Sequence, residues 1–128
     1  MTYHFSKTLD LPFDIAVEKV TADLKQEGFG IITEIDVKKT LKEKLDVDFR
    51  KYKILGACNP PLAYQALKAE DKIGTMLPCN VIVQEVNDSK TEVSAVDPIA
   101  SMQAVQNESL GDVAKEVSKK LQEIIKGL

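Results

Sequence analysis

The chain has 128 residues, of which 44% are hydrophobic and 29% are charged. This composition is that of a folded globular protein and excludes a disordered chain, and the length suits one domain over residues 1–128. Its 17 basic and 20 acidic side chains leave a net charge of −3, which argues against a nucleic acid partner.

The sequence offers no segment that would anchor it in a membrane. No apolar run reaches 18 residues, and the first seven residues lack the apolar stretch of a signal peptide. We therefore expect a cytoplasmic protein with no membrane partner. In that reducing compartment, Cys58 and Cys79 are expected to be free thiols.

A strand, a helix and a second strand are predicted for the first quarter of the chain. Residues 2–9 alternate as in a short strand, and a helix then begins with Asp10 as its cap and ends at Gly28. The apolar positions of this helix recur every three or four residues: Phe13, Val17, Val20 and Leu24. Residues 29–35 are apolar and β-branched, which predicts a buried strand.

The next two elements are a short helix over 37–45, capped by Asp36, and a strand over 50–58. Alternation along this strand places Cys58 on the same face as Ile54. Because Lys51 and Lys53 occupy the other face and need water, we expect Cys58 to point into the core.

The rest of the chain is predicted to contain two helices and a hairpin. A helix starts after Asn59 and reaches about residue 68, a loop follows over 71–78, and strands at 80–86 and 91–96 form the hairpin. The last helix covers 110–126, with Ser109 and Asp112 resembling a capping box. The short connections favour an α+β fold, with one mostly antiparallel sheet and helices packed on one face.

The strand directions predict where chemistry is placed. If the strands at 50–58, 80–86 and 91–97 are neighbours that alternate in direction, three of their ends meet at one edge of the sheet. Those ends carry Cys58, Asn59, Cys79, Asn80 and Asp97. A helix begins beside them, and its N-terminus is partially positive. The group can bind an anion, a soft metal ion or a sulfur-containing small molecule, and a thiol just before the helix is expected to have a lowered pKa.

A purely structural interpretation stands beside this one. Buried free cysteines often serve as small hydrophobic residues, Asn59 caps a helix, and Asp97 precedes a turn. The spacing gives no zinc motif, because no CxxC pair is present and two further ligands would be needed. His4 is the only histidine, so a Ser/His/Asp triad is disfavoured, and we expect a protein that is not an enzyme.

Two motifs carry a family resemblance. Residues 52–67 read YKILGACNPPLAYQAL and residues 74–83 read GTMLPCNVIV, followed by Val-Asp-Pro at 96–98. Together they resemble the family known as domain of unknown function 302. The resemblance implies a fold similar to a single-copy TATA-binding-protein-like arrangement, a homodimer, and a bacterial or archaeal source. It implies no established activity and no DNA binding.

Three hypotheses follow for function. The first is a homodimeric module that binds a small ligand, an anion or a metal ion in a pocket formed by Cys58, Asn59, Cys79, Asn80 and Asp97. The second is a thiol-based redox or sulfur-transfer protein that uses Cys58 as the nucleophile. The third is a protein-interaction domain with structural cysteines. The sequence identifies no cofactor.

Overall fold

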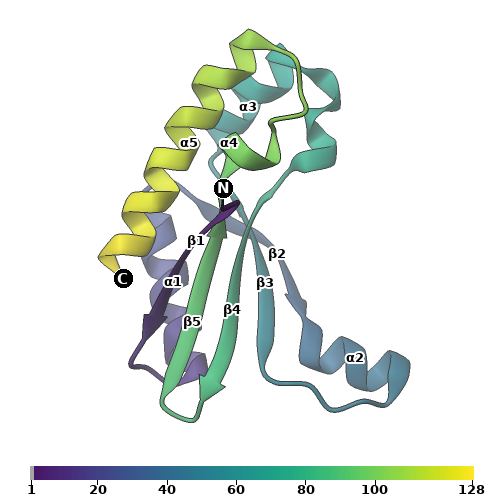
Figure 1. Ribbon diagram of the computed structural model, residues 1–128, viewed down its shortest axis with the longest axis vertical. Coiled ribbons are helices and arrows are strands. Elements are labelled where there is room, and N and C mark those ends of the chain that lie inside the picture. Colours follow the sequence, from purple (N-terminus) through teal and green to yellow (C-terminus); the bar gives the residue numbers. More distant parts are fainter. Residues whose placement is uncertain (1) are drawn as a thin grey trace.

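Five strands form one antiparallel sheet in the computed structural model, which describes residues 2–128 (Figure 1). The strands lie in the order β1-β5-β4-β3-β2, and every neighbouring pair is antiparallel. The elements in chain order are β1 (His4–Leu9), α1 (Phe13–Gln26), β2 (Gly30–Asp36), α2 (Val37–Leu45), β3 (Tyr52–Cys58), α3 (Pro60–Ala69), the 3-10 helix η1 (Asp71–Met76), β4 (Cys79–Asn87), β5 (Lys90–Val96), α4 (Pro98–Ser101) and α5 (Glu108–Gly127).

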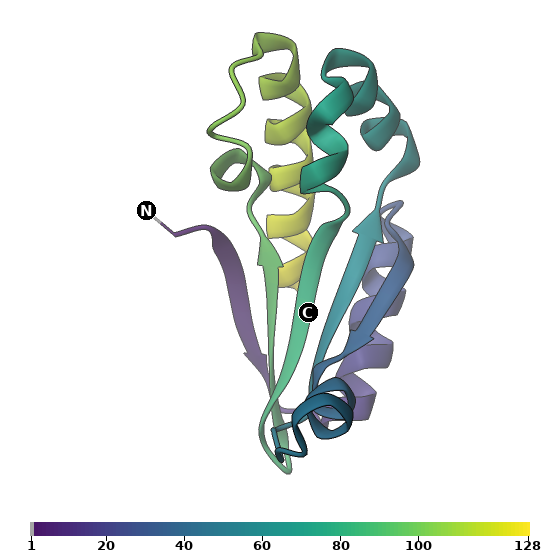
Figure 2. The ribbon, with the colours of Figure 1, turned by 90° about the vertical axis from the view of Figure 1, so that its right-hand side faces the viewer.

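Helices α1 and α5 cover one face of the sheet (Figures 1 and 2). The central strands bury Val81, Val83, Val93 and Ala95 completely on that face. Burial of this aliphatic surface is the main source of stability, since each fully buried side chain contributes about 1.5–3 kcal/mol. The α+β class and the antiparallel sheet predicted from the sequence are confirmed.

Three helix ends form as their local sequences predict. Asp36 accepts a hydrogen bond from the Lys39 amide at 3.0 Å, and Asn59 accepts one from the Leu62 amide at 3.3 Å. Gly28 ends α1 with a φ of +87°, a left-handed conformation that costs glycine little because it has no Cβ.

Two predicted caps are wrong. Asp10 lies outside α1, whose first turn follows Pro12 with no side-chain cap, and the Asp10 carboxylate instead lies 3.5 Å from the Lys90 ammonium. The last helix starts earlier than predicted, because Asn107 caps it through the Ser109 amide at 3.1 Å.

The predicted orientation of β3 is also wrong. Leu55 and Ala57 face the helices and are almost fully buried, whereas Ile54 lies on the uncovered face, where it pairs with Ile82. The lysine on the covered face, Lys53, lies at its margin and reaches Glu34 at 2.8 Å. A long lysine stem allows this arrangement, since it can follow an apolar surface while its ammonium stays in water.

Two short helical segments were not predicted. The segment 71–78, expected as a loop, contains η1, and α4 directly follows β5. Together with α3 and the first turns of α5 they form a helical end beyond the sheet (Figure 2). No helix in residues 2–128 has the length and hydropathy needed to cross a membrane.

Candidate binding cavity

A cavity of about 320 Å³ lies where the helical end meets the sheet. Its walls come from the ends of β3 and β4, from α3, η1 and α5, and from both ends of α4. The side chains that line it are almost entirely apolar, and the more buried of them are Phe29, Ala57, Leu62, Ala66, Met102 and Ala114.

An irregularity in β2 shapes the entrance. The register of β2 against β3 shifts between Ile31 and Thr33, so Ile32 has no partner in the ladder. Such a bulge turns a side chain out of the strand's regular alternation. Ile32 is exposed and lines the cavity, as does the exposed Leu67 of α3. The entrance is therefore apolar as well.

Both cysteines line this cavity, as their predicted convergence requires. Cys79 pairs with Ala57 in the β3–β4 ladder, and Cys58 is the next residue along β3. Cys79 is buried, whereas Cys58 is half-exposed at the strand's end. The two thiols are therefore neighbours across one strand pair, one inside the cavity wall and one nearer to solvent.

The buried thiol is poorly suited to nucleophilic chemistry. Burial, together with the nearby Cys58 thiol, raises the pKa of Cys79 from its ordinary value of 9.0 to about 11. Burial acts in this direction because the anion loses hydration that the apolar walls do not replace. At neutral pH Cys79 is a protonated thiol, and the thiolate is the form that attacks electrophiles.

Among residues 2–128, Asn59 supplies the only side-chain amide in the lining. Its carbonyl oxygen already accepts the Leu62 amide, and a Cβ placed on Gly28 would lie 3.2 Å from its nitrogen. The residue therefore caps the start of α3 and lies close to Gly28 at the end of α1. In the part of the chain that the structure describes, no charged side chain lines the cavity, so an anion held there would lack a cationic partner.

The structure does not bring Asn80 into the cavity with Cys58, Asn59 and Cys79. Asn80 pairs with Gly56 and is exposed on the uncovered face of the sheet. It borders a separate surface hollow there, whose polar side chains include Ser6, Gln84, Glu92 and Ser94.

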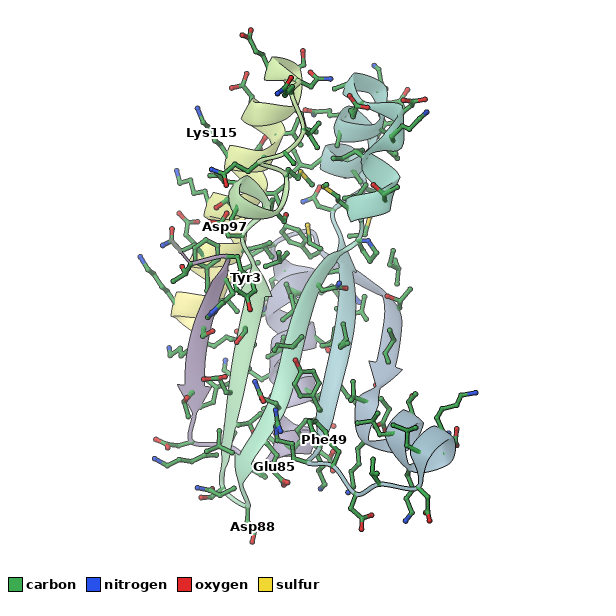
Figure 3. The ribbon with its side chains drawn as sticks, turned by 45° about the vertical axis from the view of Figure 1, so that its right-hand side comes forward. Tyr3, Phe49, Glu85, Asp88, Asp97 and Lys115 are labelled. Carbon is green, nitrogen blue, oxygen red and sulfur yellow. The ribbon has the colours of Figure 1, made fainter. Side chains whose placement is uncertain are left out.

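Asp97 has a structural environment of its own. One carboxylate oxygen accepts hydrogen bonds from the Ile99 amide at 3.0 Å and from the Ser118 hydroxyl at 2.9 Å. Its backbone amide also donates to the carbonyl oxygen of Tyr3 at 2.8 Å, and Figure 3 shows the two residues side by side above the end of the sheet. These contacts tie β1, α4 and α5 together, and Asp97 itself does not line the cavity.

Several cavity residues were not predicted from the sequence because they belong to helical segments that were not predicted either. Gly74 comes from η1 and Leu77 directly follows it. The one available signal was the apolar spacing of Ile73, Met76 and Leu77, which a loop has no reason to carry.

Comparison with known proteins gives a family without an assigned role. The sequence profile of the family described as "Domain of unknown function DUF302" matches residues 5–128. Among solved structures, the uncharacterized conserved protein DUF302 from Bacillus stearothermophilus superposes with a TM-score of 0.89, at 26% identity and over 98% of each chain. No curated protein matches. Neither description states an activity, so the functional conclusion depends on the cavity.

Proposed function

Because the chain belongs to the DUF302 family of unknown function, as the motifs around Cys58 and Cys79 predicted, we propose its function from the cavity: it is a binding module that holds a small apolar molecule. The observation that supports this proposal is a half-open cavity with apolar walls and a single amide. Binding sites for small molecules are commonly concave and apolar, with a few polar groups that orient the ligand.

The size of the cavity limits the ligand. An apolar cavity of about 150 Å³ stays dry and accepts benzene. The volume of about 320 Å³ found here is roughly twice that, so a molecule with two fused rings, or an aliphatic chain of similar volume, fits. Its affinity would come from burial against side chains such as Leu62 and Val117, at about 25 cal/mol for each Å² of apolar surface removed from water.

Titration of the ¹⁵N-labelled protein with naphthalene tests the proposal. We expect saturable changes at the backbone amides of Phe29, Ala66 and Ala114. The variant Ala66→Leu fills the cavity and should weaken binding at least tenfold. Ala22→Leu is the matched control, because Ala22 is an exposed residue of α1.

The outcome that contradicts the proposal is equally specific. If naphthalene and aliphatic probes of similar volume leave these amides unchanged, or if Ala66→Leu binds as tightly as the unaltered chain, the cavity is not a binding site. The circular dichroism of each variant shows whether it has folded.

The rival thiol-based function makes a different prediction. A redox or sulfur-transfer role requires a reactive thiolate at Cys58, which the half-exposed position of Cys58 would admit. Rates of Cys58 alkylation measured between pH 5 and 10 distinguish the redox function from simple binding. A pKa for Cys58 well below that of free cysteine would favour the redox function, whereas an ordinary value favours simple binding.

We further propose that two copies of the chain pair through the uncovered face of the sheet. α2 stands beside this face (Figures 1 and 2) and buries none of its residues. Ile35, 49% exposed, lies at the junction of the sheet and α2, with Leu45 and Val47 also exposed nearby in sequence. Exposed apolar residues that gather on one surface are typical of protein–protein contacts.

Size-exclusion chromatography with light-scattering detection tests whether two copies of the chain pair. We expect a dimer mass for the unaltered chain and a monomer for Ile35→Glu. Ile15→Glu is the matched control, because Ile15 is 48% exposed but lies on α1, on the other side of the sheet. A monomeric unaltered chain, or equal effects of both substitutions, would refute this surface.

A further inference from the structure

Three of the sulfur-bearing side chains in residues 2–128 line the cavity. These residues contain two cysteines and two methionines, and Cys58, Cys79 and Met102 contribute to the cavity wall whereas Met76 does not. Figure 3 shows the sulfur atoms, in yellow, gathered where the strands meet the helical end. Thiolates and thioethers are the donors that soft metal ions prefer.

The ladder brings the two thiols within reach of one ion. Directly paired residues of an antiparallel ladder have Cα atoms about 5 Å apart, and one step along a strand adds about 3.4 Å. The offset between Cys79 and Cys58, by way of Ala57, therefore places their Cα atoms about 6 Å apart. Both residues line the same cavity, and Cα atoms about 6 Å apart are close enough for the sulfur atoms to reach the separation of about 4.5 Å that two metal–sulfur bonds span.

We propose that Cys58 and Cys79 form a binding site for a soft monovalent metal ion of the copper(I) class, with Met102 as a third sulfur donor. This inference uses the cavity of the proposed function but a different ligand class and different residues. The apolar-ligand experiment with Ala66→Leu therefore tests the proposed function alone, and the experiment below tests the metal site alone.

The donor set selects copper(I) over zinc. Structural zinc takes four ligands in a tetrahedron, usually cysteine and histidine. Within residues 2–128, no three His, Cys, Asp or Glu side chains come together as a metal-binding group. Two thiols and one thioether are thus too few and too soft for zinc, whereas copper(I) accepts low coordination numbers with sulfur donors.

The binding step balances in charge and protons. Each thiol gives up its proton and forms one bond to the ion, so one ion displaces two protons and no electron is transferred. Two thiolates and one monovalent cation leave one negative charge. The half-exposed position of Cys58 keeps that charge partly hydrated, since α3 begins with Pro60 and Pro61 and offers it no free N–H in its first turn.

Competition for copper(I) tests the site. The reduced protein is titrated anaerobically with copper(I) held by a chromophoric chelator, and proton release is followed with a pH indicator. We expect one ion per chain and about two protons released per ion. Cys58→Ser and Cys79→Ser should each weaken binding at least a hundredfold, and Met102→Leu about tenfold. Met76→Leu should have no effect, because that sulfur does not line the cavity.

A second measurement needs no variant and so does not depend on any substitution folding. One equivalent of copper(I) should protect both cysteines from alkylation, as read by mass spectrometry. The proposal is overturned if the chain takes no copper from the chelator, if Cys79→Ser binds as tightly as the unaltered chain, if both thiols are alkylated equally fast with and without the ion, or if zinc binds with equal stoichiometry and affinity.

Discussion

Replacement of Asp97 by alanine tests whether its carboxylate stabilises the fold or binds a ligand. In the folded chain one oxygen of Asp97 accepts the Ile99 amide, which caps α4, and also the hydroxyl of Ser118 from α5. Ser118 is buried, so its hydroxyl has little access to water once the carboxylate is gone. Asp97→Ala therefore removes a helix cap and leaves a buried donor without its partner.

The expected loss of stability is the sum of two contributions. Loss of an N-cap costs about 1 kcal/mol, and loss of a hydrogen bond to a charged group costs about 1.5–3 kcal/mol. Asp97→Ala should lower the free energy of unfolding by about 3 kcal/mol. Ser118→Ala retains the cap and should cost about half as much, and Asp97→Asn, which keeps an acceptor oxygen, about 1 kcal/mol.

Urea unfolding followed by circular dichroism measures these differences, and the double variant completes a thermodynamic cycle. Because the two side chains share one hydrogen bond, the effects of Asp97→Ala and Ser118→Ala should be non-additive by at least about 0.5 kcal/mol. A loss below about 0.5 kcal/mol for Asp97→Ala would refute the structural reasoning. Loss of naphthalene or copper binding with unchanged stability would instead return Asp97 to the binding site, as the sequence predicted.

Three further predictions concern stability. Leu121→Ala should cost about 2–5 kcal/mol in urea unfolding because this side chain of α5 is fully buried, and a cost below 1 kcal/mol would contradict that packing. Gly56→Ala should cost about 1–3 kcal/mol, since the added methyl would overlap the Thr33 hydroxyl and lie 2.7 Å from Pro78. Gly111→Ala meets open space in α5 and should be neutral or stabilising, and equal effects would contradict this. Because the pKa of Cys79 is raised from 9.0 to about 11, the unfolded chain ionises this thiol at lower pH than the folded protein does. The free energy of unfolding is therefore unaffected by this thiol below pH 9 and falls as pH rises to about 11. Over that window the unaltered chain should lose about 2–3 kcal/mol more stability than Cys79→Ala, and parallel pH profiles of the two would disprove this.

Local chemistry determined the features that the sequence predicted correctly. Asp36 and Asn59 cap helices through amides only three residues away, and Gly28 ends α1 through its own backbone freedom. Each of these helix ends depends only on residues within one turn of it, so its sequence predicts it without knowledge of the tertiary structure. The convergence of Cys58 and Cys79 was predicted on the premise that their strands are antiparallel neighbours. The structure has that pairing, although the β3–β4 connection contains α3 and η1 and does not by itself impose it.

The tertiary structure alone decided which face of β3 is covered and what encloses the cavity. Leu55 and Ile54 are both aliphatic, and only the position of α1 on one side of the sheet makes the first of them core. Asn80 and Asp97 lie at the same edge of the sheet as the cysteines, yet Asn80 turns to the uncovered face and Asp97 accepts a hydrogen bond from Ser118, 21 residues away in sequence. Packing between distant elements sets these environments, because a side chain's burial depends on what lies opposite it in space and not on its neighbours along the chain.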